Sequence, residues 1–183
     1  MSLHNVTPGS RAPEEFNVII EIPMNADPIK YEVDEDSGAM FVDRFMATAM
    51  HYPCNYGYIP QTLADDGDPV DVLVVTPVPL IPGVVVTCRP LGVLRMVDEA
   101  GGDNKLLAVP VDRVLSIYTQ WQKPEDLNPL RLRTIQHFFE HYKDLEAGKW
   151  VKVEGWDGAE GARQEVVAGI AAWAKKRASP AQK

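Results

Sequence analysis

Residues 84–97 read Val84-Val85-Val86-Thr87-Cys88-Arg89-Pro90-Leu91-Gly92-Val93-Leu94-Arg95-Met96-Val97, a stretch dominated by valine and leucine. It follows Gly83 and stops at Asp98, and both residue types are uncommon inside strands. Two shorter runs, Val70–Thr76 and Leu106–Val111, have a similar composition and are also bounded by Asp, Gly or Pro. Aliphatic and β-branched runs between such residues are typical of buried strands, so these stretches predict the centre of a β-sheet.

Weaker candidate strands come earlier in the chain. They cover Val18–Ile22, Lys30–Val33 and Met40–Phe45, each between turn residues. No helical period separates the predicted strands in the first two thirds of the chain. Strands that follow one another without helices favour an antiparallel sheet or a closed barrel.

The last third of the chain changes to a helical period. A first helix is predicted from near Pro129 to Gly148, then a short strand at Trp150–Val153, and a second helix that opens with Asp157. The apolar stripes of these helices are Leu130, Ile135, Phe138, Phe139, Tyr142 and Leu145 in the first, and Val166, Val167, Ile170, Trp173 and Ala174 in the second. We therefore predict a mainly β, α+β fold in a single domain over residues 1–183, with a polar tail from about residue 178.

Composition and charge limit the function classes. The chain has 26 acidic and 18 basic residues and a formal net charge of -8, which opposes binding to nucleic acid or an anionic membrane. The charge-free stretch Val72–Cys88 is interrupted by prolines and a glycine, so it predicts two strands and not a membrane span. The N-terminus lacks a signal-peptide pattern, and Cys54 and Cys88 form no CxxC pair, which predicts reduced thiols in a cytoplasmic protein.

The segment Asp65-Asp66-Gly67-Asp68-Pro69-Val70-Asp71 crowds carboxylates into a tight turn that leads into an apolar strand. Carboxylates this close raise one another's pKa unless cations offset their charge. Hard oxygen ligands suit Mg²⁺ or Ca²⁺, although the spacing does not match an EF-hand loop. Taken alone, the segment is also compatible with a solvated acidic turn.

A second acidic hairpin strengthens the metal interpretation. Asp98, Glu99 and Asp103 flank two glycines between strong strands, and Lys105 follows. Two such turns at strand ends could face each other across a barrel mouth and hold more than one metal ion. Metals that share a water lower its pKa, which is what phosphoryl hydrolysis at neutral pH requires. A solvated hairpin is the simpler alternative for this segment by itself.

Cations, phenols and further acids lie between these segments. Lys30 and Glu32 share one face of a predicted strand, and the planar guanidinium of Arg44 suits a phosphate. Each of these residues has an ordinary structural explanation when it is considered singly. The same holds for the remaining candidates, which are Glu21, Tyr52, Tyr56, Tyr142 and Lys143.

Together these segments resemble those of family I soluble inorganic pyrophosphatases of the bacterial type. The resemblance extends from about Asn5 to Ala174. The matching segments are Glu21-Ile22-Pro23, Lys30-Tyr31-Glu32, Val42-Asp43-Arg44, Tyr52-Pro53-Cys54-Asn55-Tyr56-Gly57, Asp66-Gly67-Asp68-Pro69-Val70-Asp71-Val72-Leu73 and Lys149-Trp150-Val151-Lys152-Val153-Glu154-Gly155-Trp156.

The resemblance implies a five-stranded, OB-like closed barrel with two packed helices, assembled as a homohexamer. It also implies hydrolysis of pyrophosphate to two phosphates by a metal-activated water. Several Mg²⁺ ions would bind each subunit, with Mn²⁺, Zn²⁺ and Co²⁺ as alternative ions.

Residue roles follow from the same resemblance. Asp68 would act as general base. Asp66, Asp71 and Asp103 would hold the principal metal, and Asp98 a further one with Asp103. Glu21 and Glu32 would serve the metal that travels with the substrate. The residues expected to bind phosphate oxygens are Lys30, Arg44, Tyr56, Lys105, Tyr142 and Lys143.

Two competing interpretations, a zinc protease and a noncatalytic nucleic-acid module, have less support in the sequence. His137-Phe138-Phe139-Glu140-His141 fits the H-x-x-E-H pattern of zinc proteases, but the chain is small and offers no evident third ligand. The pyrophosphatase resemblance instead predicts that this helix contacts other subunits and that His137 and His141 tune assembly at mildly acid pH. A noncatalytic OB-type module for nucleic acid should carry a basic groove, whereas this chain is acidic.

Overall fold

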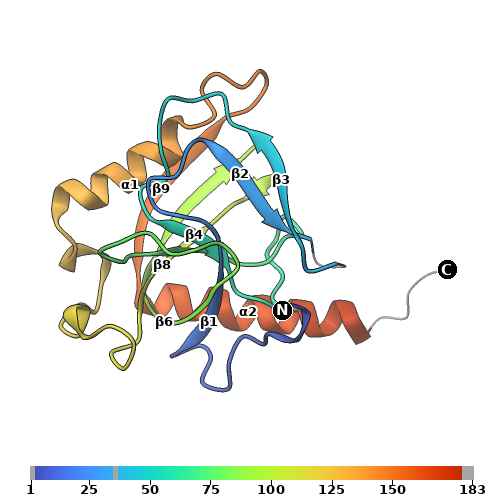
Figure 1. The fold of residues 1–183 in the computed structure, drawn as a ribbon, viewed down its shortest axis with the longest axis vertical. Coiled ribbons are helices and arrows are strands. Elements are labelled where there is room, and N and C mark those ends of the chain that lie inside the picture. The colour runs from blue at the N-terminus through green and yellow to red at the C-terminus, as the bar shows by residue number, and fades with distance from the viewer. Residues whose placement is uncertain (1–2, 35–36, 179–183) are drawn as a thin grey trace.

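The computed structural model describes residues 3–34 and 37–178 (Figure 1). Strands dominate the first two thirds of the chain and two long helices lie in the last third. The strands are β1 (Phe16–Ile22), β2 (Ile29–Val33), β3 (Met40–Phe45), β4 (Asn55–Tyr58), β5 (Asp71–Val74), β6 (Val85–Asp98), β7 (Gly101–Gly102), β8 (Lys105–Pro110) and β9 (Val151–Gly158). The helices are α1 (Pro129–His141) and α2 (Ala159–Ala178), with 3-10 turns η1 (Leu3–Asn5), η2 (Ser116–Tyr118) and η3 (Pro124–Asp126).

Five strands form a closed ring in the order β1-β4-β5-β8-β6, because β6 also pairs with β1. Four of the five pairings are antiparallel, and β5 pairs with β8 in parallel. The predicted five-stranded barrel with two helices is therefore confirmed. The parallel pair departs from the simple antiparallel pattern, because the whole of β6 lies between β5 and β8 in sequence and returns the chain to the same end of the barrel.

Strand β6 has 14 residues and pairs with four others: β1 along its first part, β8 along its middle, and β7 and β9 along its end. Its register shifts between Pro90 and Gly92 and again between Arg95 and Met96. Such bulges bend a strand and increase its twist, which lets one long strand serve both the ring and its extension. Strands β2 and β3 form a separate hairpin beside the barrel (Figure 1).

Side chains alternate between two hydrophobic clusters on the two faces of the strand layer. On β5, Val72 and Val74 join one cluster and Leu73 joins the other. Helix α2 adds Ala162 and Val166 to the first cluster. Helix α1 covers the second cluster with Ile135, Phe138 and Phe139. Each helix thus covers a different face of the same strand layer.

The first helix ends at His141, seven residues before the predicted stop at Gly148. The chain continues in tight turns, in which the Asp144 N–H donates to the His141 carbonyl at 3.1 Å and the Glu146 N–H to the Lys143 carbonyl at 2.9 Å. Lys143 is buried in this segment, and its ammonium lies 2.6 Å from the Asp98 carboxylate. The ion pair between Lys143 and Asp98 therefore stabilises this segment in a conformation other than the last turns of the predicted helix.

Two strands differ from the sequence prediction. Strand β9 continues to Gly158 and not Val153, because it pairs with β6 along its whole length and Gly155 adopts a φ of 127° at the register shift. Strand β4 is not among the strands predicted from the sequence. It is fixed by the buried Asn55, whose side chain bonds to backbone groups of Met24, Val74 and Leu80. None of those partners is adjacent in sequence.

The second helix begins at Ala159, two residues after the predicted opening at Asp157, and continues to Ala178. The predicted polar tail beyond that residue lies outside the described residues. Within residues 3–34 and 37–178, no helix is long and apolar enough to span a membrane.

Gly57 is predicted to be indispensable for the barrel. It lies in β4 between β1 and β5, where an added Cβ would lie 2.0 Å from the Ile19 carbonyl oxygen. Gly57→Ala should lower the free energy of unfolding by about 3 kcal/mol or more in urea denaturation, because two backbones must separate. Gly158→Ala is the control, since no atom lies within 4 Å of its added Cβ, and it should change stability by less than about 0.5 kcal/mol. Equal losses in both variants would contradict this account.

Candidate active site

The acidic turn before β5 is held by its own backbone. The Ala64 N–H donates to the Asp68 carbonyl at 2.7 Å, and the Gly67 N–H donates to the Ala64 carbonyl at 3.1 Å. Gly67 has a φ of 97°, which a residue with a side chain rarely adopts. The Asp68 N–H donates to an Asp66 carboxylate oxygen at 3.0 Å. The turn thus projects carboxylates from the start of β5 as a defined group.

The second acidic hairpin joins β6 to β7. The Asp98 carboxylate accepts from the N–H groups of Ala100 at 2.8 Å and Gly101 at 3.2 Å, which fixes the turn. The Asp103 N–H then donates to the Met96 carbonyl at 2.9 Å, so the chain returns along β6 before β8 begins at Lys105. This hairpin places Asp98 and Asp103 on neighbouring segments.

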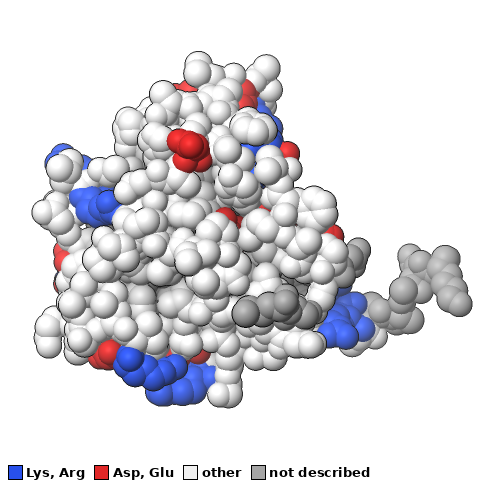
Figure 2. Space-filling view, viewed as in Figure 1, with Lys and Arg blue, Asp and Glu red and all other residues white. Residues whose placement is uncertain are grey.

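Both acidic turns open into one pocket with a volume of about 390 Å³. Every site residue proposed from the sequence lines it, together with several others. The proposed residues are Glu21, Lys30, Glu32, Arg44, Tyr56, Asp66, Asp68, Asp71, Asp98, Asp103, Lys105, Tyr142 and Lys143. The face seen in Figure 2 carries few charged groups, most of them at its margin. The structure brings the candidates together, and their individual roles stay predictions.

Lys105 lies at the floor of the pocket, where only 5% of its side chain is exposed. Its ammonium donates to the carboxylates of both Asp71 and Asp103. Burial by itself would lower the pKa of Lys105, but the charges of these two carboxylates outweigh it and hold the pKa well above its usual range. A cation therefore bridges two of the predicted metal ligands.

A second lysine pairs with the other hairpin. The Lys143 ammonium lies 2.6 Å from the Asp98 carboxylate and 3.7 Å from that of Glu99. Burial of Asp98 opposes ionisation, but the bond and charge of Lys143, together with the bonds from the Ala100 and Gly101 N–H groups, outweigh it and lower the pKa of Asp98. The neighbouring phenol of Tyr142 is buried, which raises its pKa, so it keeps its proton and can donate.

Glu21 enters the pocket through an irregularity of β1. The register with β4 shifts between Ile20 and Ile22, and such a bulge re-aims the side chain it contains. The carboxylate is 6% exposed and accepts from the Val33 N–H at 2.8 Å. Burial, followed by the charge of Asp71, raises the pKa of Glu21 to about 8.

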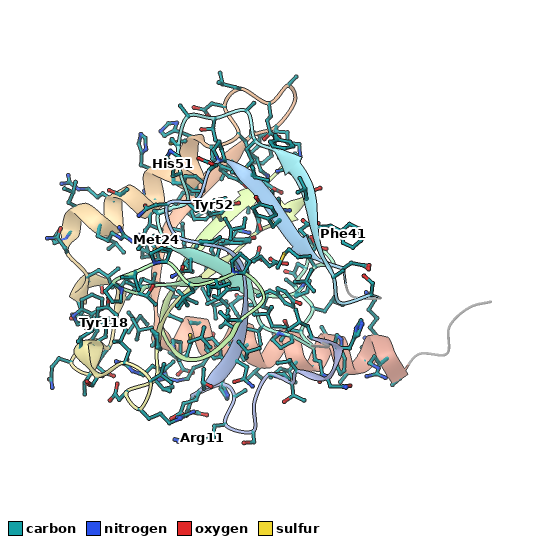
Figure 3. The ribbon with its side chains drawn as sticks, in the orientation of Figure 1. Arg11, Met24, Phe41, His51, Tyr52 and Tyr118 are labelled. Carbon is teal, nitrogen blue, oxygen red and sulfur yellow. The ribbon has the colours of Figure 1, made fainter. Side chains whose placement is uncertain are left out.

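The hairpin of β2 and β3 contributes Lys30, Glu32 and Arg44 to the pocket lining. The Lys30 ammonium donates to Glu32 and lies 3.7 Å from the Asp43 carboxylate. Within the described part of the chain, Nε of Arg44 is buried without a hydrogen-bond partner, 3.8 Å from a Glu146 oxygen. Figure 3 shows Tyr52 inside the molecule, whereas Phe41 projects from β3 into solvent.

The donor set suits a divalent cation such as Mg²⁺, because it consists of carboxylate oxygens with unbalanced charge. The pocket walls partly desolvate Asp66 and Asp68, and with neighbouring carboxylates this raises the pKa of both groups. Neither forms an ion pair with any residue of ranges 3–34 and 37–178. In those same ranges, no three acidic, His or Cys side chains are already close enough to hold a metal alone.

Some pocket residues were given no role from the sequence. Glu99 lies 3.6 Å from Lys149 and 3.7 Å from Lys143, and both lysines line the pocket. Tyr52 also lines it, in ring contact with Tyr56 at 5.3 Å between centroids. A signal was present, because Tyr52 and Lys149 lie in segments that carry the family resemblance and Glu99 lies in the second acidic hairpin. Only the fold shows that these residues line the same cavity.

The H-x-x-E-H motif lies on the exposed side of α1. The rings of His137 and His141 are 4.6 Å apart, and Nδ1 of His141 lies 2.9 Å from the Asp144 carboxylate. In the part of the chain that the structure describes, no third side chain completes a metal site with them. A zinc protease centre therefore has no structural support.

The chain is similar to known proteins over most of its length. Residues 18–174 match the family model for inorganic pyrophosphatase. The chain is 62% identical over 176 residues to the inorganic pyrophosphatase of Salmonella typhimurium, covering 96% of this chain and all of the relative. It is 64% identical over 168 residues to that of Escherichia coli K12, covering 92% and 96% of the two chains. The chain belongs to the inorganic pyrophosphatase family.

Solved structures agree with this assignment. An inorganic phosphatase from Anaplasma phagocytophilum superimposes with a TM-score of 0.91 at 49% identity, covering 93% of this chain and 99% of that one. The inorganic pyrophosphatase of Thermus thermophilus gives 0.88 at 45% identity, covering 95% and 99%. The similarity to bacterial family I pyrophosphatases is thus confirmed. The family comprises hydrolases that act on pyrophosphate with divalent metal ions, and this membership gives no support to a noncatalytic OB-type module for nucleic acid.

The buried Glu21 predicts a pH dependence of the stability of the metal-free pyrophosphatase. Between its ordinary pKa of 4.5 and the folded value of about 8, the folded chain keeps a proton that the unfolded chain releases. Unfolding therefore releases a proton, and this group makes stability fall as pH rises from about 5 to 8. Glu21→Gln should remove that contribution, gaining a few kcal/mol relative to wild type at pH 8 and almost nothing at pH 4.5. Urea denaturation in EDTA across this range measures it, and parallel pH profiles would contradict it.

Proposed function

We propose that this chain hydrolyses inorganic pyrophosphate to two phosphates by direct attack of an activated water on phosphorus, with Asp68 as general base. The water oxygen forms a bond to one phosphorus, and the bond from that phosphorus to the bridging oxygen breaks. The proton of the water passes to Asp68, and the second phosphate leaves. The observation that carries this proposal is the convergence of carboxylates and cations around one pocket in a member of this family.

The metal sites are proposed from the donor set. Asp66, Asp71 and Asp103 would hold the principal ion, and Asp98 would hold another together with Asp103. Glu21 of β1 and Glu32 of β2 would serve an ion that arrives with the substrate. When bound, divalent cations lower the pKa of the attacking water and offset the charge of the diphosphate. Mg²⁺ is the proposed ion, with Mn²⁺, Zn²⁺ and Co²⁺ as alternatives.

Asp68 is suited to accept a proton because of its position. It lies at the exposed end of the acidic turn, and its backbone is fixed by bonds to Ala64 and Asp66. Partial desolvation, then the charge of Asp71, raises the pKa of its carboxyl. A carboxylate with a raised pKa is a stronger base, and no lysine or arginine in the described residues forms an ion pair with it.

The substrate would be bound by four cations and two phenols. Lys30 and Arg44 come from the β2–β3 hairpin, Lys105 from the start of β8 and Lys143 from the turns after α1. Burial raises the pKa of Tyr56 and Tyr142, so both phenols stay protonated and can donate to phosphate oxygens. Donors fixed in a desolvated pocket stabilise the charge that develops on the leaving phosphate.

We also propose that residues 1–183 form one domain and that the pyrophosphatase is a cytoplasmic homohexamer. The family resemblance supports these proposals. The exposed Phe45 and Leu145, at 75% and 77%, would suit coverage by another subunit. Sedimentation velocity would distinguish a hexamer from a smaller assembly.

Removal of divalent metal is predicted to abolish turnover. Phosphate release from pyrophosphate should be rapid with Mg²⁺ and fall to background in excess EDTA. Without the metal, the pKa of the attacking water is not lowered and the charge of the substrate is not offset. Restoring Mg²⁺ in excess over the chelator should restore the rate. Equal phosphate release in EDTA would disprove the metal requirement.

Asp68→Asn is predicted to separate metal binding from chemistry. The amide keeps an oxygen of similar size and position but cannot accept the proton, so kcat should fall by about 10²- to 10⁴-fold. Calorimetric titration with Mn²⁺ should show affinity close to that of wild type, because Asp66, Asp71 and Asp103 are unchanged. A wild-type rate in this variant would remove Asp68 from the role of base.

A further inference from the structure

Asn104 lies between Asp103 and Lys105, and its side chain is anchored at both ends. Its carbonyl oxygen accepts from the Met96 N–H at 3.3 Å. Its amide nitrogen donates to a Glu165 carboxylate oxygen at 3.3 Å. One anchor is the backbone of β6 and the other is a side chain of α2. The segment between two pocket residues is thus tied to a distant helix.

Glu165 is itself fixed by a second partner. The oxygen that accepts from Asn104 also accepts from the Arg95 guanidinium. Arg95 uses another nitrogen to bind the Asp157 carboxylate at 3.1 Å. The side chains of Glu165 and Arg95 are 27% and 29% exposed, so solvent screens this contact less than it would a surface pair. Arg95 therefore holds the Glu165 carboxylate in place beneath Asn104.

The network lies directly behind the acidic pocket. A small cleft on the far side is lined by Glu165 and Asn104, and it shares Asp66, Asp71 and Asp103 with the pocket. The three residues proposed for the principal metal thus have the substrate pocket on one side and Asn104 with Glu165 on the other. A movement of the 103–105 segment would change the separation of Asp103 from Asp71.

We propose that Glu165 is a positioning residue of this pyrophosphatase: through Asn104 it restricts movement of the 103–105 segment relative to Asp71, and so supports divalent metal binding by Asp71 and Asp103. This inference rests on the proposed function of Asp71 and Asp103. Glu165 touches neither substrate nor metal. Its effect passes through one hydrogen bond to Asn104, which lies between the proposed ligand Asp103 and Lys105. Lys105 in turn bridges Asp71 and Asp103.

Three variants test the proposal, each measured as the full-length protein. Glu165→Ala removes the acceptor of Asn104, Glu165→Gln keeps an acceptor oxygen, and Asp157→Ala breaks the other ion pair of Arg95 without touching Asn104. The probe is Mn²⁺ alone, titrated calorimetrically into metal-free protein. The Tm in EDTA and the kcat and KM for pyrophosphate at saturating Mg²⁺ are measured beside it.

Glu165→Ala should bind Mn²⁺ about 3- to 10-fold more weakly, less than the 10- to 100-fold typical of groups bonded directly to a ligand. Glu165→Gln should stay within about twofold of wild type, since rescue by the conservative variant depends on the hydrogen bond. Asp157→Ala should lower the Tm about as much as Glu165→Ala while leaving Mn²⁺ affinity unchanged. At saturating Mg²⁺, kcat and KM should be close to wild type in all three variants.

The double variant Asn104→Ala, Glu165→Ala tests whether Glu165 acts through Asn104. In an Asn104→Ala background, loss of Glu165 should weaken Mn²⁺ binding no further, because the two side chains act as one unit. Unchanged affinity in Glu165→Ala, or an equal loss in Asp157→Ala, would overturn the proposal. Absence of phosphate release from wild-type protein with Mg²⁺ would instead refute the proposed function, and the affinity comparison would still decide the role of Glu165.

Discussion

The hydrogen bonding of β6 is the constraint on which the rest of the structure depends. This one strand pairs with β1 to close the ring, with β8 inside it, and with β7 and β9 beyond it. Its end carries Asp98, and the hairpin that follows carries Asp103. Closure of the barrel and placement of the second acidic turn are therefore consequences of the same strand, and neither can change without the other.

Gathering acids in one pocket has an electrostatic cost that the fold offsets only in part. Lys105 compensates Asp71 and Asp103, and Lys143 compensates Asp98. Asp66 and Asp68 have no such partner in the described residues, and the pKa of each is raised. The protein alone thus leaves a net negative pocket, whose charge the divalent metal ions of this family can offset.

The two helices have different relations to this pocket. Helix α1 packs on one hydrophobic cluster, and the turns after it bring Tyr142 and Lys143 into the pocket wall. Helix α2 packs on the other cluster and reaches the acidic site only from behind, through Glu165 and Asn104. Packing of α2 therefore serves both the hydrophobic core and the position of the 103–105 segment.

The sequence by itself determined the main strands, both helices and the family, because valine-rich runs, helical periodicity and the acidic turn are local signals. The pocket residues could also be predicted from the sequence, because ordered motifs resemble those of one family. Only the tertiary structure decided the strand at Asn55–Tyr58, the early end of α1 and the parallel pairing of β5 with β8. It alone also decided which carboxylates receive a lysine and that Glu165 lies behind Asp103. These features depend on hydrogen bonds and ion pairs between residues far apart in sequence, and no local pattern encodes such partners.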